Sequence, residues 1–410
     1  MRRLLQHFFL TLFILVTPLK GFGIDRDLAK SINHTGMFLY YIMDKSHNTI
    51  MSPLAISSSL LMAYMGAKGE TAHQIAAGLH LTLPQNQVVP AYLSLANHLT
   101  EAGKVEISNA MWVDTDAHIL SSYQSIVKKG FNGEIQLVNF AKPQIAARKI
   151  NAWVYDKSHE KIQNFINPSD ISSSTRMILL NNLLVKGSWK SPFLTQSTGT
   201  HPFTQYDGNT VLCKMMRQVN DFYYFENEDT QVVALEIESL DSHLAFVVFL
   251  PRKASDNIYN FYYSQDESKP EGFLTYLSQL RRTSVDVSIP KFITSQKVNL
   301  IPLYRALGIN SALTRSADFS GIDGTKNLMI NKSFQQNVLS IDEGGIFAAA
   351  ATGTSFSLKS TRPDAEASFV ADRPFLYAIY DFDTGLLLFL GECQNPVETG
   401  IVEVTGGQSS

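Results

Sequence analysis

The chain has 410 residues, of which 45% are hydrophobic and 17% are charged, and its formal net charge is −3. This length and composition allow a large hydrophobic core, and the small net charge excludes the strongly basic surface that binds nucleic acid or anionic membranes. The two cysteines, Cys213 and Cys393, are too few for a disulfide framework. A single bridge between them is one alternative, but we favour two separate thiols because their spacing shows no pairing pattern.

The first 23 residues have the three parts of a secretory signal peptide. Met1–Arg3 is basic, residues 4–16 form an apolar run, and Gly21–Gly23 offers a small-x-small cleavage site. The run is shorter than the roughly 20 residues that span a bilayer. We therefore predict a signal peptide at 1–23 and rank a buried N-terminal helix below it. The protein is expected to be secreted, or periplasmic in a Gram-negative host, with no membrane segment.

Helical periodicity dominates the first part of the mature chain. Residues 48–79 carry apolar side chains at helical spacing, interrupted by Gly66 and Gly69. A second helix is predicted in residues 146–165, on an apolar face made of Ile150, Trp153, Val154 and Ile162.

After Arg176 the pattern changes to short strands, several of them apolar on both faces and therefore central in a sheet. These strands are predicted in residues 177–189, 230–239, 243–251, 284–292 and 385–393. Helices that precede strands, with the first strands interleaved among them, indicate a single α+β domain over residues 24–398. Residues 399–410 are predicted to form a flexible tail.

Motifs for catalysis or metal binding are missing from the sequence. It has no G-x-S-x-G, no H-E-x-x-H, no phosphate-binding loop and no C-x-x-C. Its ten histidines are scattered, and His47, His73 and His98 lie in polar surroundings that favour surface histidines over ligands. Asp342 and Glu343 are neighbours in an apparent strand, so their carboxylates would face opposite sides. We predict that the chain is not an enzyme and holds no metal and no cofactor.

An unusual stretch lies near the C-terminus, at residues 340–369. Gly344 and Gly345 are followed by four alanines, Ala348, Ala349, Ala350 and Ala351, and then by a run rich in Thr, Ser and Gly. Alanine favours helices, but its neighbours here favour turns or strands, and bulky anchoring residues are rare. The composition suits a segment that is exposed in one state and fits a tight place in another.

Ten short motifs, spread from about Asp25 to Pro396, together resemble the serpin family. They include "ISNAMWV", "LNNLLVKGSWKSPF", "SIPKF", "ADFSGI", "LSIDEGG", "ADRPFLYAI" and "FLGECQNP", in the family's order. The resemblance implies one domain with three β-sheets, eight to nine helices and an exposed reactive-centre loop at about 343–370. In the family this loop enters the large sheet as a new strand after it is cut, and small residues such as Ala348–Ala351 would enter with little steric cost.

The resemblance also implies where a protease would cut. The reactive bond of inhibitory serpins usually lies sixteen residues after the hinge glutamate, here Glu343, which gives Lys359–Ser360. A lysine at this position selects a trypsin-like pocket with a carboxylate at its base. Leu358, in a shifted frame, would suit a chymotrypsin-like enzyme. Arg362 ranks low because its bond leads into Pro363.

Further site residues follow from the same resemblance. The hinge comprises Glu343–Ala351, and its first inserted position holds Ile346, followed by Phe347, where inhibitors usually have threonine or serine. The control point under the sheet, called the shutter, would comprise Ser52, Asn181 and Gln335. Glutamine stands there in place of the usual histidine, and we expect Gln335 to bridge the other two without pH sensitivity. At the top of the sheet, Trp189 and Lys291 match the family, with Lys291 the expected partner of Glu343.

Two classes of function are therefore implied. The first is a secreted, monomeric suicide inhibitor, whose partner is a serine protease held as a covalent acyl-enzyme; a shifted reactive bond would direct it to a chymotrypsin-like or cysteine protease instead. The second is a non-inhibitory serpin with a carrier, storage or chaperone role. We favour the first because small hinge residues are needed only for insertion.

Overall fold

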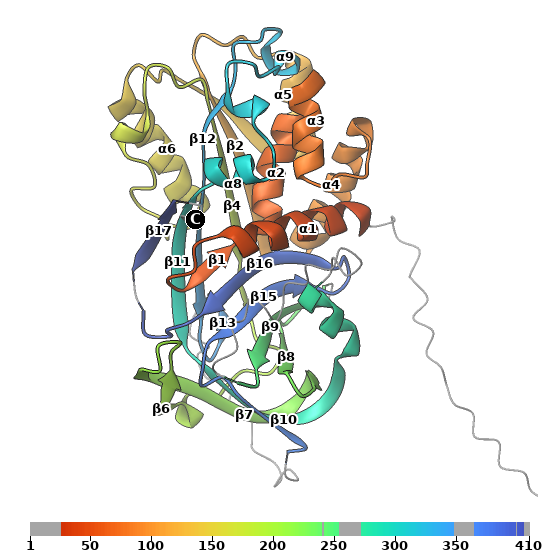
Figure 1. The fold of residues 1–410 in the computed structure, drawn as a ribbon, viewed down its shortest axis with the longest axis vertical. Helices are drawn as coiled ribbons and strands as arrows, with labels where there is room; N and C mark the ends of the chain where they lie inside the picture. Colours follow the sequence, from red (N-terminus) through yellow and green to blue (C-terminus); the bar gives the residue numbers. More distant parts are fainter. Residues whose placement is uncertain (1–25, 240–241, 254–271, 348–364, 399, 406–410) are drawn as a thin grey trace, which may run out of the picture.

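The computed structural model describes residues 26–239, 242–253, 272–347, 365–398 and 400–405. The predicted signal peptide at 1–23 lies outside these residues. Helices gather in the upper half of the molecule in Figure 1, with α6 on one side and α2 to α5 on the other. Their bounds are α1 Arg26–Ile42, α2 Pro53–Tyr64, α3 Gly69–Gly78, α4 Gln85–Glu101, α5 Ser121–Gly130, α6 Pro143–Lys157, α8 Ile301–Ala306 and α9 Ser320–Asp323, and a 3₁₀ segment, η3, spans Gly272–Gln279.

The strands of the described residues form two hydrogen-bonded sheets. The eight-stranded sheet has the order β17 Ile401–Thr405, β11 Phe292–Asn299, β12 Ile330–Ile341, β4 Met177–Val185, β2 Val105–Asp114 and β3 Gly133–Val138, with the short β13 Gly345–Ile346 between β12 and β5 Gly187–Ser188. The nine-stranded sheet has the order β1 Thr49–Met51, β16 Leu386–Cys393, β15 Phe375–Asp381, β9 Leu244–Pro251, β8 Thr230–Glu236, β7 Thr210–Glu226, β10 Arg281–Pro290 and β14 Ala367–Val370, and β6 Gly199–Thr204 pairs with β7.

The three sheets of the expected fold appear as two in the described chain because β7 and β10 are shared. One end of β7 pairs with β6 and the other with β8, while β14 pairs with β10. The third sheet is therefore continuous with the second. Figure 1 shows β6, β7 and β10 together at the bottom of the molecule.

Helix α2 is the centre of the core. All twelve of its residues are buried, which is expected of a helix that is apolar on every side. It begins at Ser52, whose hydroxyl accepts a hydrogen bond from the backbone N–H of Ala55, and Pro53 follows at the first helical position. The helix packs against β4 of one sheet and β16 of the other, so Ser52 lies where the two sheets approach each other.

Three local predictions need correction or completion. The helix predicted to reach residue 165 ends at Lys157, and Ile162 is buried from the loop that follows. The predicted flexible tail is wrong for residues 401–405, which form β17 and pair in parallel with β11; the unpaired edge of β11 provides their hydrogen-bond partners. Cys213 and Cys393 are both buried free thiols, as favoured above.

Candidate functional site: the hinge end of the large sheet

The chain enters the hinge through a tight turn, residues 342–345, and not through a strand. The carboxylate of Asp342 accepts hydrogen bonds from the backbone N–H groups of Gly344, at 2.8 Å, and Gly345, at 3.2 Å. The prediction that Asp342 and Glu343 lie in a strand is therefore wrong. An aspartate that binds N–H groups two and three residues ahead stabilises a turn, and β12 accordingly ends at Ile341.

Gly345 and Ile346 already lie inside the sheet. Ile346 pairs with Ile341 of β12 and Gly187 of β5, and its side chain is fully buried. Gly345 has a φ of +150°, and a Cβ atom there would lie 2.0 Å from the carbonyl oxygen of Gly187. Only glycine fits this close approach. Ile346 is thus accommodated between β12 and β5 in the intact chain.

The chain leaves the sheet at Phe347. Its N–H donates to the carbonyl of Ser340 at 3.1 Å, which is one more contact along β12, but its φ is +46°. A left-handed conformation costs a residue with a Cβ atom about 1–2 kcal/mol. The ring lies 5.9 Å from the ammonium group of Lys161, in the segment after α6. The four hinge alanines, Ala348–Ala351, lie outside the described residues.

Trp189 and Lys291 hold the hinge turn from two sides. The indole N–H of Trp189 donates to the carbonyl of Asp342 at 2.8 Å, and its backbone N–H donates to that of Gly344 at 2.9 Å. The Lys291 ammonium lies 2.6 Å from the Glu343 carboxylate, which is the contact expected from the sequence. Thr198, which the sequence did not suggest, donates to the other oxygen of Glu343 at 2.8 Å.

These bonds fix the charge state of Glu343. Burial alone would raise its pKa, but hydrogen bonds from Lys291, from the backbone and from Thr198 outweigh burial, so the pKa lies below its ordinary value. The carboxylate is therefore ionised near neutral pH. An ionised Glu343 anchors the start of the hinge to Lys291, the residue between β10 and β11.

The shutter residues interact differently from the prediction. Gln335 accepts a hydrogen bond from the backbone N–H of Ser52 at 3.0 Å and donates to the backbone carbonyl of the same residue at 3.1 Å. Asn337 donates to the Gln335 carbonyl oxygen at 2.8 Å. The predicted bridge to Asn181 is wrong, because the backbone of Ser52 uses both ends of the Gln335 amide. Asn181 donates instead to Asn109, one strand further away on β2.

Strands β12 and β4 are paired over only part of their length. Their register pairs run from Ile330 with Met177 to Gln335 with Asn181, and no further pair follows in the described residues. Asn182, the next residue of β4, donates to the backbone carbonyl of Lys157 at the end of α6. We call residues 336–341 the upper part of β12, although this end, next to β13, is the lower end of the strand in Figure 1. On one side the upper part pairs with β11 throughout. On the other side, toward β4, it has a strand neighbour only at Ile341, where β13 pairs with it.

The predicted reactive bond, Lys359–Ser360, lies outside the described residues. The chain is described again from residue 365, and Ala367–Val370 form β14, which pairs in parallel with β10. Phe347 thus follows a strand of the eight-stranded sheet, β13, and residue 365 precedes a strand of the nine-stranded sheet, β14.

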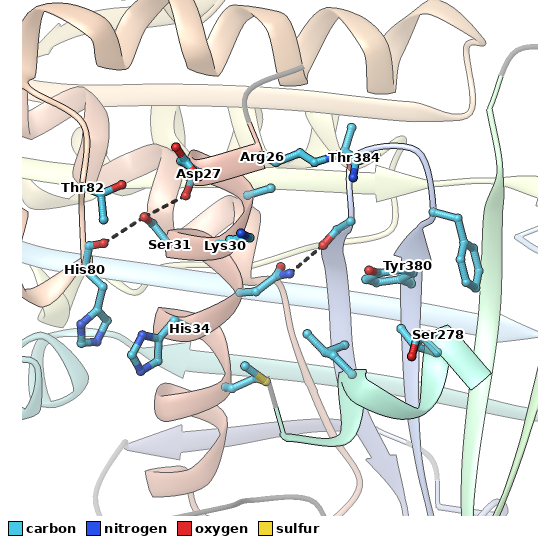
Figure 2. A pocket seen from close by; sticks show the side chains of 17 residues that line it. Arg26, Asp27, Lys30, Ser31, His34, His80, Thr82, Ser278, Tyr380 and Thr384 are labelled. Atoms are coloured by element: carbon cyan, nitrogen blue, oxygen red, sulfur yellow. Dashed lines mark hydrogen bonds between the residues drawn. The ribbon is translucent and has the colours of Figure 1, made fainter. Parts of the chain in front are cut away.

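A separate cavity of about 480 Å³ lies between α1, η3 and the turn that joins β15 to β16. Figure 2 shows His34 and His80 next to each other on one side of it, and Tyr380 and Ser278 on the other. The two imidazole rings stack with their centroids 4.0 Å apart. Burial lowers the pKa of both histidines, and for His80 the neighbouring His34 adds to this, so both are neutral near pH 7.

Comparisons with known proteins agree with this architecture. The family model for serpins (serine protease inhibitors) matches residues 30–396. The chain is a serpin. It is 31% identical over 383 residues to an uncharacterised serpin-like protein of Thermococcus kodakarensis, covering 91% of this chain and 87% of that one. It is 30% identical over 354 residues to a serine protease inhibitor of Cyanea capillata, covering 85% and 92%.

The solved structure of thyroxine-binding globulin in complex with thyroxine is also similar. It superimposes with a TM-score of 0.78 and 25% identity, covering 90% of this chain and 99% of that one. Serpins as a family are protease inhibitors, and this relative shows that a protein of the same fold binds a small molecule. Within the described residues no helix has the length and hydropathy needed to cross a membrane.

Proposed function

We propose that this serpin is a secreted suicide inhibitor of trypsin-like serine proteases, acylated at Lys359. The protease serine would attack the Lys359 carbonyl carbon, and the Lys359–Ser360 bond would break as Ser360 leaves with the new amine. Insertion of residues 345–358 would then carry the protease across the molecule and distort its active site before the ester is hydrolysed. The inhibitor would act as a monomer without a cofactor.

The observation that carries this proposal is the state of the upper part of β12. Its pairing with β4 ends at Gln335, while the first two inserting residues already pair with β12 and β5. Each further residue that enters would gain ladder hydrogen bonds without first separating β12 from β4 along residues 336–340. The side chains of Ala348–Ala351 are small enough to follow Ile346.

The test is incubation of the purified full chain with trypsin, followed by denaturing gel electrophoresis. We expect a complex that survives SDS, with loss of trypsin activity. Lys359→Arg should retain the complex and Lys359→Ala should abolish it. Ala350→Arg should leave a substrate that trypsin cuts without being trapped, because a charge would be buried on insertion.

Other outcomes would redirect the assignment. If the Lys359→Ala variant inhibits trypsin at the parental rate, Lys359 is not the reactive residue. A complex with chymotrypsin, cleaved after Leu358, would establish the shifted frame. A trapped cysteine protease would show that the target is a cysteine protease and not a serine protease. Cleavage of every variant without a complex would contradict inhibition.

A carrier role is the second candidate, and the cavity beside α1 is the observation that favours it. Its rim has two basic residues, Arg26 and Lys30, and one acidic residue, Asp27, and so carries a net positive charge. The stacked rings of His34 and His80 form a flat aromatic wall. These features suit an anionic aromatic ligand. Thyroxine is a suitable probe in a fluorescence titration, with His34→Trp as a cavity-filling control. Saturable binding that this variant loses would support a carrier, and no binding would exclude this ligand class.

A further inference from the structure

Three side chains from distant parts of the sequence converge on the far side of the β15–β16 turn. His98 belongs to the last turn of α4, Asp381 ends β15, and Asp383 lies in the turn itself. One ligand atom of each residue lies within 4.8 Å of the others. His98, predicted to be a surface histidine, has a side chain only 19% exposed, and that of Asp381 is completely buried.

The distances among these groups differ from those of a direct hydrogen bond. His98 Nε2 lies 3.5 Å from Asp381 and 3.6 Å from Asp383. By contrast, His159 approaches Glu106 to 2.6 Å elsewhere in the protein. Bonds of about 2.0–2.2 Å from a tetrahedral Zn²⁺ ion place neighbouring ligand atoms about 3.3–3.5 Å apart. The two separations from His98 are close to this second geometry, and the two carboxylates lie within 4.8 Å of each other.

Two buried atoms of this cluster lack a hydrogen-bond partner. Within the described residues, Asp381 Oδ1 and His98 Nε2 are buried and make no hydrogen bond. Among the residues that the structure describes, no lysine or arginine forms an ion pair with Asp381 or Asp383. A buried carboxylate without a compensating charge is costly, and a divalent cation would balance the two aspartates.

The carboxylate oxygens nearest His98, Asp381 Oδ2 and Asp383 Oδ2, also accept hydrogen bonds from other residues, as the ligands of a metal usually do. Asp381 Oδ2 accepts hydrogen bonds from the N–H, at 3.0 Å, and the hydroxyl of Thr384. The backbone N–H of His243 donates to Asp383 at 3.1 Å, and its imidazole Nδ1 lies 2.6 Å from the same carboxylate. These partners fix the orientation of both carboxylates toward His98.

We propose that His98, Asp381 and Asp383 form a Zn²⁺ site that joins α4 to the β15–β16 turn. One imidazole nitrogen with two carboxylates suits Zn²⁺, whereas Ca²⁺ and Mg²⁺ prefer oxygen ligands alone. The Asp383 side chain is 28% exposed, which leaves a side open for water as the fourth ligand. This site was not predicted from the sequence, because His98 is separated by 283 residues from Asp381 and no linear metal-binding motif joins them.

The test is equilibrium dialysis of the tag-free full chain, stripped with EDTA, against buffered Zn²⁺. We expect one tight site per chain, a thermal midpoint higher by several degrees with Zn²⁺, and no such effect of Mg²⁺. His98→Ala should lower the affinity at least 100-fold and abolish the thermal shift. His243→Ala should lower the affinity about 10–100-fold, as loss of a supporting hydrogen bond does.

His159→Ala is the matched control, because this histidine pairs with one carboxylate only, and its Zn²⁺ affinity should equal that of the parent. Asp383→Asn provides a second ligand variant that is partly exposed, should Asp381→Asn fail to fold. Substitution by Co²⁺ gives an independent readout through its visible absorption, which His98→Ala should remove. A parent chain without a tight site, or a His98→Ala variant that binds as tightly as the parent, would overturn the proposal.

Discussion

Strand β12 has two halves with different neighbours on its β4 side, and under the proposed mechanism the difference explains how one sheet can be stable and still accept a strand. Its lower half, up to Gln335, pairs directly with β4, and the Gln335 amide is bonded to the backbone of Ser52 under the sheet. Its upper half is paired at Ile341 with the hinge strand β13 instead. The lower half thus has fixed interactions, while the upper half pairs with the segment where the proposed insertion would begin.

Breaking the lower half should have the largest effect on the intact protein. Gln335→Met removes both hydrogen bonds to the buried backbone of Ser52. It leaves the Ser52 N–H unpaired and takes the acceptor from the Asn337 amide, while the Ser52 carbonyl keeps its bond from the Ile56 N–H. We expect the free energy of unfolding to fall by about 3 kcal/mol, since each buried unpaired group costs roughly 1–3 kcal/mol. Chemical denaturation of the intact chain measures this loss.

The neighbouring Gln336 provides a matched control. It is also buried, but its Nε2 atom has no hydrogen-bond partner in the described residues. Gln336→Met should therefore change the stability by less than about 1 kcal/mol. Equal losses in the two variants would show that the Gln335–Ser52 contact does not distinguish this half of the strand.

Blocking the close approach in the upper half should have the next largest effect. Gly345→Val places a side chain against the Gly187 carbonyl, so β13 should be expelled from between β12 and β5 at a cost of about 2 kcal/mol. Limited proteolysis should then cut at Ile346, which is buried in the parent. Gly344→Ala, one residue earlier and outside β13, is the control; protection of Ile346 in the valine variant would contradict the assignment.

The anchor at Glu343 should make the upper half sensitive to acid. Because the folded pKa lies below its ordinary value of 4.5, the ionised carboxylate stabilises the fold above about pH 4.5. This contribution is lost as the pH falls through the folded pKa. Glu343→Gln should cost about 1 kcal/mol at pH 7 and nothing at the lowest pH at which the protein stays folded.

Denaturant titrations at a series of pH values measure this difference. Lys291→Met removes the same bond and should show the same cost at pH 7. A cost of Glu343→Gln that is independent of pH would mean that the charge of Glu343 does not hold the hinge.

The smallest expected effect concerns the residue at which the chain leaves the sheet. Phe347→Gly removes the left-handed strain, whereas Phe347→Ala keeps a Cβ atom and removes only the ring. The glycine variant should be more stable than the alanine variant by about 0.5–1 kcal/mol, although glycine also gains freedom in the unfolded chain. Thermal unfolding of the two intact variants measures this difference. A more stable alanine variant would show that the backbone at residue 347 is not strained.

Much of the fold was predictable from the sequence, because apolar periodicity and local motifs specify it. The buried helix after Ser52, the apolar strand over residues 177–185 and the pairing of Lys291 with Glu343 all follow patterns visible in the chain. The tail strand was not predictable, because residues 401–405 become a strand only through the edge of β11.

The finer contacts of the site depend on register and competition between partners. Sequence reasoning expected Gln335 to bond both Ser52 and Asn181, and its side chain does bond Ser52, through the backbone N–H and carbonyl. It could not show that Asn181, although in register with Gln335, would donate to Asn109 instead. Polar residues in these strands, such as Asn109 and Asn337, were a visible signal of this network.

The most direct test of the account compares the thermal unfolding of the intact chain with that of the chain cleaved after Lys359. If β12 receives residues 345–358 as a strand, beginning at its upper half, each new ladder bond contributes on the order of 1 kcal/mol. The midpoint of the cleaved protein should then rise by tens of degrees, with the cut at Lys359 verified by mass spectrometry. Equal midpoints would mean that the loop does not enter the sheet, and would assign this serpin to the non-inhibitory class.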